Sequence, residues 1–334
     1  MFGSINYNRF SPGTYINGNY VVNINHLGQR TKRALRIGEE LVPAFPDSID
    51  LKITNKCSRG CPFCHENSTP TGKILNLEKT IEKLEQLPKV GIELAIGGGN
   101  VFECPEETAE LITWANGRGF NPRITVRYED LEEHQDYISR IKRFEEKTVP
   151  EAWRKILTVV NTIGISVDKH VEFPEIEGYS LSRGTPTPDN IVWHVIIGIT
   201  SLEEVIKMLK DDTYYRNILF LGLKQFGRAK DYNIPDLTEW KKEITSCIYR
   251  LRKYYDGRRR KTISFDNLAL KQLNIKEVLT PDEWETMYQG QDFSSSMYVD
   301  AVEGMLAPNS TSTNRTSWDE IGIVDYFNKY HNEF

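Results

Sequence analysis

Three cysteines in the stretch KCSRGCPFCHENS, residues 56–68, are the side chains best suited to carry chemistry. Cys57, Cys61 and Cys64 are three of the chain's five cysteines, and they fall within eight consecutive positions. Deprotonated cysteines are ligands for Zn²⁺ and for iron–sulfur clusters. The spacing therefore predicts a metal centre, and the number of ligands indicates which kind.

A structural zinc site needs four ligands, which usually come as two pairs separated by a longer loop. Here the cysteines form a triplet, and His65 directly follows Cys64, where it is awkwardly placed to complete the same tetrahedron. Cys104 and Cys247 would join the triplet only through the tertiary fold. A cubane on three cysteines leaves one iron free to bind and activate a small molecule, so the missing fourth ligand favours a reactive cluster.

The residues on either side of the triplet predict a strand, a loop and a helix. Ile49, Leu51 and Ile53 alternate with polar residues, which is typical of a strand that ends just before the cysteines. After the loop, apolar residues recur at helical spacing between Asn76, a suitable N-cap, and Pro88, which closes the element. The cysteines thus lie in a loop that follows a strand.

The same unit recurs along the chain. Strands are predicted over 47–54, 92–99, 123–128, 162–168, 191–199 and 217–223, and helices follow several of them, including one after Pro105 and those over 129–147, 201–210 and 236–255. Alternating strands and helices predict an α/β fold with a mainly parallel sheet. Six units indicate an open or partial (β/α)6 TIM-like barrel, in which the cysteine loop lies at the C-terminal mouth.

The two ends of the chain are interpreted as additions to this core. Asn17-Gly18 between two apolar stretches predicts an N-terminal hairpin. We expect a strand and a short helix at the edge of the sheet over 262–273. The last forty or so residues, rich in Ser, Thr, Asn and Gly, are typical of a loop or cover segment more than of core, either a surface tail or a flap over an active site. The expected domains are an N-terminal extension over 1–46, a core over 47–230, and a C-terminal helical extension with the cover segment over 231–334.

The cysteine pattern resembles that of the radical S-adenosylmethionine (radical SAM) enzymes. The resemblance rests on Cys-x3-Cys-x2-Cys after a first strand, with Phe63 just before the third cysteine, and on AIGGGN (95–100) at the end of a second strand. It implies a [4Fe-4S] cluster on Cys57, Cys61 and Cys64, whose open iron chelates SAM. It further implies reductive cleavage of SAM to a 5′-deoxyadenosyl radical, which abstracts hydrogen from a substrate, and an external one-electron reductant of the flavodoxin or ferredoxin kind.

The resemblance also implies residues that bind SAM. Phe63 would pack near the adenine, and the main chain of Gly97 and Gly98 would meet the amino group, with Gly99 beside them; glycine suits a strand end that a ligand approaches closely. Ser166 and Asp168 are candidates for the ribose or carboxylate. The chain departs from the family's pattern where Gly99 replaces the usual acidic residue and Asn100 a common proline. The resemblance covers residues 47–230.

Other polar residues near predicted strand ends are weaker candidates. Arg127 is expected either to hold a substrate carboxylate or phosphate or to pair with Glu129 or Asp130. His194 lies in an apolar strand and is expected to be a core histidine with its hydrogen bonds satisfied.

Four further polar residues each have two interpretations, and the two cysteines outside the triplet have one. The polar residues either contribute to the site or serve as loop and capping residues: His65 and Glu66 next to the cluster, and Lys224 and Gln225 after the sixth strand. Cys104 and Cys247 stand alone, and isolated cysteines are usually small buried hydrophobic residues, so burial is expected for both.

Composition narrows the classes of function. Apolar residues make up 39% and charged residues 27% of the 334 residues, and no apolar run approaches the roughly 20 residues of a membrane span. No secretory signal is recognised at the N-terminus, so a cytoplasmic location is expected. The net charge of −5 gives no general attraction to nucleic acid, although 28–36 and 250–262 are locally basic.

The sequence therefore predicts a radical SAM enzyme whose substrate is a peptide or protein, or a nucleotide-derived molecule. The alternative is a non-catalytic zinc or iron–sulfur module that binds nucleic acid through the basic segment 250–262, whose composition suits phosphates and stacked bases. The residues do not decide between these substrates.

Overall fold

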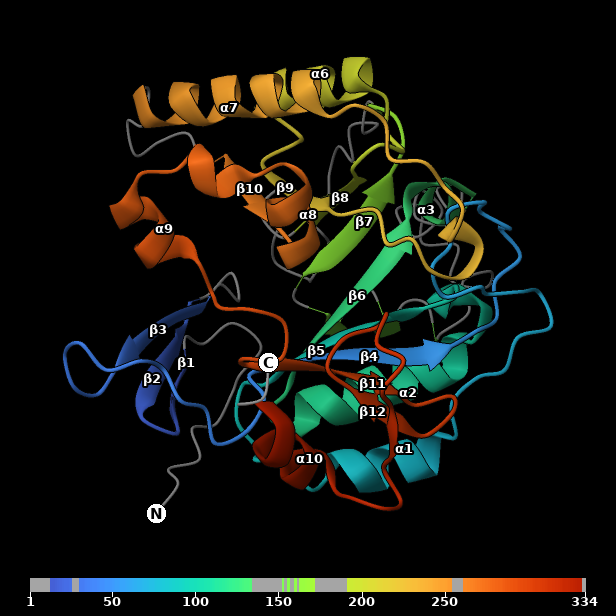
Figure 1. The fold of residues 1–334 in the computed structure, drawn as a ribbon. Helices are drawn as coiled ribbons and strands as arrows, with labels where there is room; N and C mark the ends of the chain where they lie inside the picture. The colour runs from blue at the N-terminus through green and yellow to red at the C-terminus, as the bar shows by residue number, and fades with distance from the viewer. Residues whose placement is uncertain are drawn as a thin grey trace, which may run out of the picture.

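The computed structural model describes residues 13–25, 30–133, 152, 155–156, 159–160, 162–171, 191–253 and 261–331. The described chain forms a three-stranded and a ten-stranded sheet (Figure 1). The small sheet contains β1 (Gly13–Asn17), β2 (Tyr20–Ile24) and β3 (Arg30–Ala34), all antiparallel. The predicted hairpin is confirmed, with Gly18 at a φ of 57° in its turn; β3 was not predicted.

Six strands of the large sheet lie side by side in the order of the chain and run parallel. They are β4 (Ser48–Thr54), β5 (Glu93–Gly98), β6 (Asn121–Arg127), β7 (Ile163–Val167), β8 (Ile191–Ile196) and β9 (Asn217–Leu221). All six were predicted from apolar runs, and their consecutive parallel order is that of repeated βα units.

Helices follow several of the strands along the chain. In the described residues they are α1 (Leu77–Leu84), α2 (Pro105–Gly117), α3 (Tyr128–Glu133), α6 (Leu202–Lys210), α7 (Thr238–Lys253), α8 (Asn267–Gln272), α9 (Pro281–Met287) and α10 (Ile323–Tyr330). Asn76 caps α1 by accepting a hydrogen bond from the Lys79 amide at 3.0 Å, as predicted. Pro105 occupies the first turn of α2. The predicted helix over 129–147 is described only as far as Glu133.

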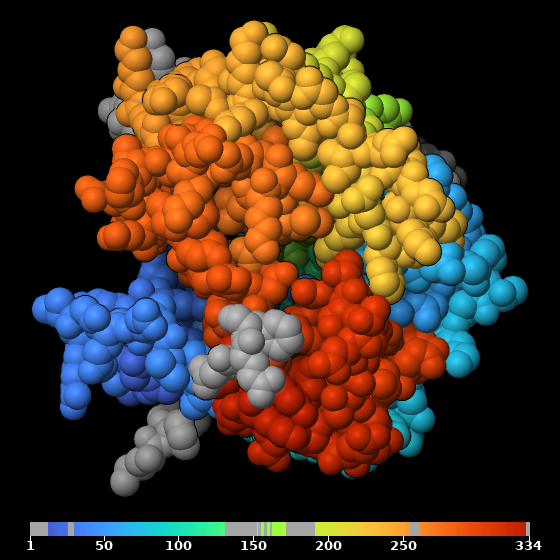
Figure 2. Space-filling view, in the orientation of Figure 1, coloured from blue at the N-terminus to red at the C-terminus, as the bar shows by residue number. Residues whose placement is uncertain are grey.

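The two faces of the parallel sheet differ in polarity. Ile49, Leu51 and Ile53 of β4 are completely buried in a core shared with the helices, whereas Asp50 between them remains exposed to solvent. Thr125 of β6, on the same face as Asp50, is also exposed. Exposed side chains in the middle of interior strands require a solvent-filled hollow on that face. Figure 2 shows a hollow between the orange and yellow surfaces and the red C-terminal segment.

The C-terminal residues extend the sheet at both edges. β10 (Thr262–Phe265) pairs in parallel with β9, so the predicted strand and short helix over 262–273 are confirmed. β11 (Ser296–Asp300) pairs in parallel with β4, followed by antiparallel β12 (Met305–Ala307) and β13 (Thr316–Ser317). The expectation of a loop or cover segment is wrong here, because four of the five β11 residues are buried.

The small sheet is fixed to the amino ends of β4 and β5 by the carboxylate and carbonyl groups of Asp47. Asn17, Tyr20 and Lys32 contact the carboxylate at 2.8, 2.5 and 2.8 Å. Arg30 donates to the carbonyls of Asp47 and Gly91 at 2.7 and 3.0 Å. The N-terminal sheet therefore lies at the end of the parallel sheet opposite the cysteine loop. No helix in the described ranges combines the length and apolar character needed to span a membrane.

Candidate functional site

The cysteine loop leaves β4 at Thr54 and rests on the end of β5. The Gly99 amide donates to the Thr54 carbonyl at 2.7 Å, and the Asn100 amide donates to the Lys56 carbonyl at 2.8 Å. The two segments that sequence analysis singled out, separated by about forty residues, are thus joined at the carboxyl ends of neighbouring parallel strands. Parallel βα folds place their ligands at these ends.

The three glycines at the end of β5 differ in the space around them. A Cβ on Gly97 would meet no atom within 4 Å, so this position is open. Gly98 has a φ of 118°, and its Cβ would lie 2.4 Å from the Thr54 carbonyl oxygen; a Cβ on Gly99 would lie 2.2 Å from that of Lys56. Gly98 and Gly99 are therefore required by the backbone packing, and Gly97 leaves room for a ligand.

The three cysteines are partly exposed and form no disulfide. The loop is ordered by its own backbone: the Cys57 amide donates to Thr69 O at 2.9 Å, and the Cys64 amide donates to Cys61 O at 3.2 Å. Among the described residues, no three His, Cys, Asp or Glu side chains lie close enough together to hold a single metal ion. Three free thiols on one short loop are nevertheless a donor set that suits an iron–sulfur cluster, which binds each thiolate at a different iron.

Arg127 at the end of β6 links the cysteine loop to β7. Its Nη1 donates to Cys61 Sγ at 3.5 Å, and its guanidinium lies 5.9 Å from the centre of the Phe63 ring. Its other nitrogens pair with Glu129 at 2.9 Å and Asp168 at 3.4 Å. The predicted ion pair with Glu129 is confirmed. Phe63 and Asp168, two of the predicted site residues, both lie beside the Arg127 guanidinium.

Ser166 of β7 is paired in register with Arg127 of the neighbouring strand β6, and it is partly exposed. Asp168 follows the strand and is exposed apart from its pair with Arg127. The structure thus brings the candidates of β7 to the same end of the sheet as the cysteine loop.

Asn100, the residue in place of the family's proline, has a local structural role. Its side-chain oxygen accepts from the Phe102 amide at 3.0 Å and caps the short 3₁₀ turn Val101–Glu103, while its nitrogen donates to Asp130 at 3.1 Å. Asp130 also pairs with Arg59 of the cysteine loop. The Asn100 side chain, at the end of β5, is therefore linked through Asp130 to Arg59 of the cysteine loop.

A buried ionic network joins the cysteine loop to β11, and sequence analysis did not foresee it. Lys52 contacts Glu66 at 3.0 Å and Asp300 at 2.9 Å, and all three side chains are at most 9% exposed. The Tyr298 hydroxyl donates to Glu66 at 3.2 Å. No local pattern in the sequence signals this contact, because Lys52 and Asp300 are 248 residues apart.

His65 completes the same network, as its Nε2 lies 3.3 Å from Glu66 Oε1. Burial lowers the pKa of His65. Burial would raise the pKa of Glu66, but the hydrogen bond to His65 and the charges of His65 and Lys52 outweigh it and lower that pKa to about 2. The two residues that follow the third cysteine therefore contact each other, and Glu66 also contacts the buried Lys52.

The remaining candidates have the following positions. His194 in β8 has a pKa lowered to about 4 by burial, and its Nδ1 has no hydrogen-bond partner, so the expectation that its bonds are satisfied is wrong for this atom. Lys224 donates to Ser310 Oγ at 2.9 Å, and Gln225 donates to the Tyr232 carbonyl at 2.8 Å. Cys104 and Cys247 are buried, as expected.

Several of the described cations of the basic segments are engaged within the chain. Arg252 pairs with Glu283, Arg250 donates to the Leu209 carbonyl at 2.6 Å, and Lys261 donates to the carbonyls of Met208 and Asp211. Residues 254–260 lie outside the described chain. Of segment 28–36, Arg30 and Lys32 bind Asp47 as noted above. These contacts favour a structural role for the described basic residues.

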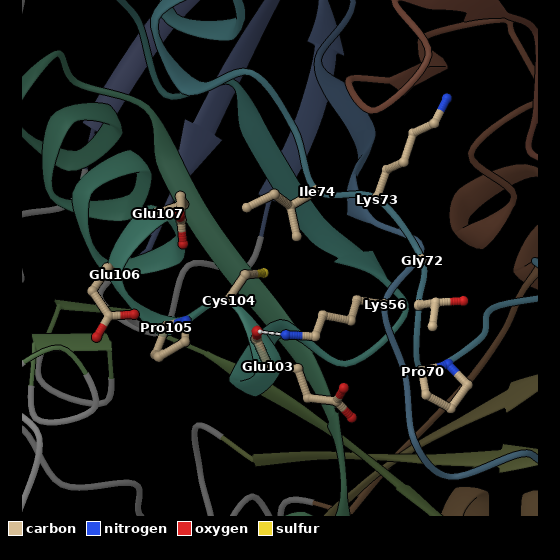
Figure 3. Close-up of a pocket in the computed structure, with 11 residues that line it drawn as sticks. Lys56, Pro70, Gly72, Lys73, Ile74, Glu103, Cys104, Pro105, Glu106 and Glu107 are labelled. Atoms are coloured by element: carbon tan, nitrogen blue, oxygen red, sulfur yellow. Dashed lines mark hydrogen bonds between the residues drawn. The ribbon is translucent and has the colours of Figure 1, made fainter.

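A groove with a volume of about 490 Å³ lies beside the loop (Figure 3). It is lined by residues 70–74 and 103–107 together with Lys56, whose Nζ donates to the Glu103 carbonyl at 3.3 Å. None of the three clustered cysteines lines it. This groove is therefore separate from the surface that the thiols present.

Comparison with solved structures identifies the fold. The chain superposes on SuiB of Streptococcus suis bound to S-adenosylmethionine with a TM-score of 0.54 and 12% identity, covering 86% of this chain and 66% of that one. For SuiB bound to its precursor peptide SuiA the TM-score is 0.52, with 11% identity and coverage of 86% and 65%. A third structure, of SuiB alone, gives a TM-score of 0.51 and 13% identity, covering 86% of this chain and 66% of that one.

This chain has the fold of SuiB. The resemblance stated from the sequence is thereby confirmed as a likeness of fold. The chain spans about two thirds of the length of SuiB. No family model matches the sequence, and no curated protein matches it.

Proposed function

We propose that this protein is a radical SAM enzyme. The observation that carries the proposal is the junction of the cysteine loop with the glycine end of β5, through Gly99 to Thr54 and Asn100 to Lys56, in a chain with the fold of SuiB. The loop with three thiols and Gly97, which has free space around its Cα, then lie together at the carboxyl ends of β4 and β5. We further propose that β4 to β9 act as a partial (β/α)6 barrel within a core over 47–230, to which 1–46 and 231–334 are additions.

Curvature of this sheet is supported by a contact between the loops that follow its first and sixth parallel strands. The Arg228 amide, just after β9, donates to the Cys64 carbonyl in the loop after β4 at 3.0 Å. The two strands are separated by four others in the sheet. A flat sheet would hold the two strand ends about 24 Å apart at about 4.8 Å per strand, so the meeting of the loops supports a curved sheet.

In this enzyme Cys57, Cys61 and Cys64 would hold a [4Fe-4S] cluster. When bound and reduced, the cluster supplies one electron that cleaves the sulfonium of SAM to methionine and a 5′-deoxyadenosyl radical, which takes a hydrogen atom from the substrate. Gly97 leaves space for SAM at its main chain, Phe63 offers a ring surface, and Ser166 and Asp168 offer polar groups. SAM and substrate bound in the hollow on the polar face of the sheet would displace its solvent from the reacting groups.

A peptide is the favoured substrate class, because SuiB has been solved with a precursor peptide. A nucleotide-derived substrate is less well supported, since Arg250, Arg252 and Lys261 of the basic segment 250–262 are bound within the chain. An external one-electron donor of the flavodoxin or ferredoxin kind would supply the electron, and the reducing cytoplasm is the location that suits free thiols.

Anaerobic reconstitution with iron and sulfide tests the proposal. We expect about four irons per chain, and release of 5′-deoxyadenosine from SAM under dithionite. Replacing Cys57, Cys61 and Cys64 by alanine removes both, whereas Cys104→Ala and Cys247→Ala, the matched controls, keep both. Zinc in place of iron, or iron retained by the triple variant, contradicts the proposal and favours a zinc module.

A further inference from the structure

The segment that follows β9 binds the cysteine loop, which follows β4 on the other side of the six parallel strands. Arg228 makes three hydrogen bonds to carbonyl oxygens of that loop. Its main-chain nitrogen donates to Cys64 at 3.0 Å, its Nε to Cys61 at 2.9 Å and its Nη1 to Ser68 at 2.6 Å. Two of the three acceptors belong to cysteines of the proposed cluster site.

Gly227 allows this close approach. It has a φ of 57°, and a Cβ there would lie 2.4 Å from the His65 carbonyl oxygen and 2.8 Å from that of Cys64. The loop therefore packs directly on the glycine backbone, where no other residue fits. The short 3₁₀ turn Gly227–Ala229 ends at Ala229, which is completely buried.

The chemistry of Arg228 suits the task of holding a loop of metal ligands. A guanidinium presents several donors in a fixed plane, so one side chain can order carbonyls from Cys61 and Ser68 at once. Residues that order metal ligands from outside the coordination shell often change metal affinity by about 10- to 100-fold.

We propose that Gly227 and Arg228 form a clamp that holds Cys61 and Cys64 in the conformation that binds the cluster, with Arg228 as a positioning residue. The inference rests on the proposed function, because it assigns the loop to a cluster. It predicts that the clamp governs retention of iron and order in residues 57–68 more than the stability of the whole chain.

The first experiment compares Arg228→Met with wild type and with Arg118→Met. Arg118 is the matched control, since its side chain is 45% exposed and pairs with Glu85, remote from the cysteine loop in sequence and contacts. After anaerobic reconstitution, we expect Arg228→Met to release iron to a chelator about tenfold faster than wild type. Arg228→Lys, which keeps the charge but reaches fewer carbonyls, is expected to be intermediate. Release at the wild-type rate from Arg228→Met overturns the clamp.

Hydrogen exchange on the metal-free proteins separates this inference from the proposed function. Loss of the clamp should accelerate exchange of the Cys64 and Asn67 amides, whose acceptors lie in the loop, and leave α7 unchanged. If wild type takes up no iron, the proposed function fails, and faster loop exchange in Arg228→Met still supports the clamp. Unchanged loop exchange overturns it. Should Arg228→Met fail to fold, Arg228→Gln is measured in its place against the same two criteria.

Discussion

The guanidinium of Arg127 donates to the sulfur of Cys61 at 3.5 Å while it pairs with Glu129 and Asp168. Burial alone would lower the pKa of Arg127, but its bond to Glu129 and the neighbouring charges raise it, so the group stays cationic. A proposed cluster ligand therefore has a permanent positive hydrogen-bond donor at its sulfur. Such donors favour the reduced state of iron–sulfur centres.

Replacing Arg127 by methionine should lower the midpoint potential of the reconstituted cluster, because the added electron loses a nearby positive charge. We expect a shift of tens of millivolts, measured by redox titration followed by electron paramagnetic resonance. Arg118→Met serves as the control and should leave the potential unchanged. A potential in Arg127→Met equal to that of wild type would show that this contact does not tune the cluster.

Gly97 and Gly98 should respond differently to alanine, although they are neighbours. Gly98→Ala forces a side chain into a left-handed conformation against the Thr54 carbonyl, and should lower the free energy of unfolding by at least about 1 kcal/mol. Gly97→Ala meets open space, so it should keep wild-type thermal stability and instead weaken SAM binding to the reconstituted protein. Calorimetry measures both quantities; undiminished SAM binding by Gly97→Ala would remove Gly97 from the site.

Asp300 should be important for stability although it lies near the end of the chain. Asp300→Asn deprives the buried Lys52 of one carboxylate and Arg315 of its partner at 3.1 Å. Breaking a buried ion pair in this way costs about 3 kcal/mol, which urea unfolding should detect. Asp319→Asn is the control, because its pairs with Lys79 and Lys83 are on the surface and contribute little. Equal effects of the two substitutions would refute the role assigned to the buried network.

Asp50 should make the stability of the protein depend on pH. Its side chain borders the solvent-filled hollow, but the surrounding protein partly desolvates the carboxyl group. This desolvation raises the pKa of Asp50 to about 6, helped by the charges of Glu93, Asp292 and Asp266 and opposed by that of Lys224. The folded state thus binds the proton more tightly than the unfolded chain, whose pKa is near 4. Its contribution to the stability is therefore most favourable below pH 4 and declines as the pH rises from about 4 to 6.

Asp50→Asn removes this charge, so it should raise the melting temperature at pH 7.5 and change it less at pH 4.5. Asp231→Asn, at an exposed position, is the control and should have little effect at either pH. An equal gain for Asp50→Asn at both pH values would mean that the carboxyl group titrates normally. Differential scanning fluorimetry in matched buffers suffices for the comparison.

Several features of the fold were predictable from short stretches of sequence. Strand alternation in Ile49, Leu51 and Ile53, the cap at Asn76 and the helix start at Pro105 depend on neighbouring residues, so the order of strands and helices could be derived locally. The same holds for the triplet of cysteines and the glycines of β5, which stand at the ends of consecutive strands.

What the tertiary structure alone decided is how distant segments meet around the cysteines. β11 was expected to be loop because its surroundings are rich in polar and small residues, yet its pairing with β4 makes it core. Arg228 and Asp300 gave no signal, since each acts on residues well over one hundred positions away. Local periodicity reports how a segment folds, whereas such contacts depend on the curvature of the sheet and on which buried charges find partners.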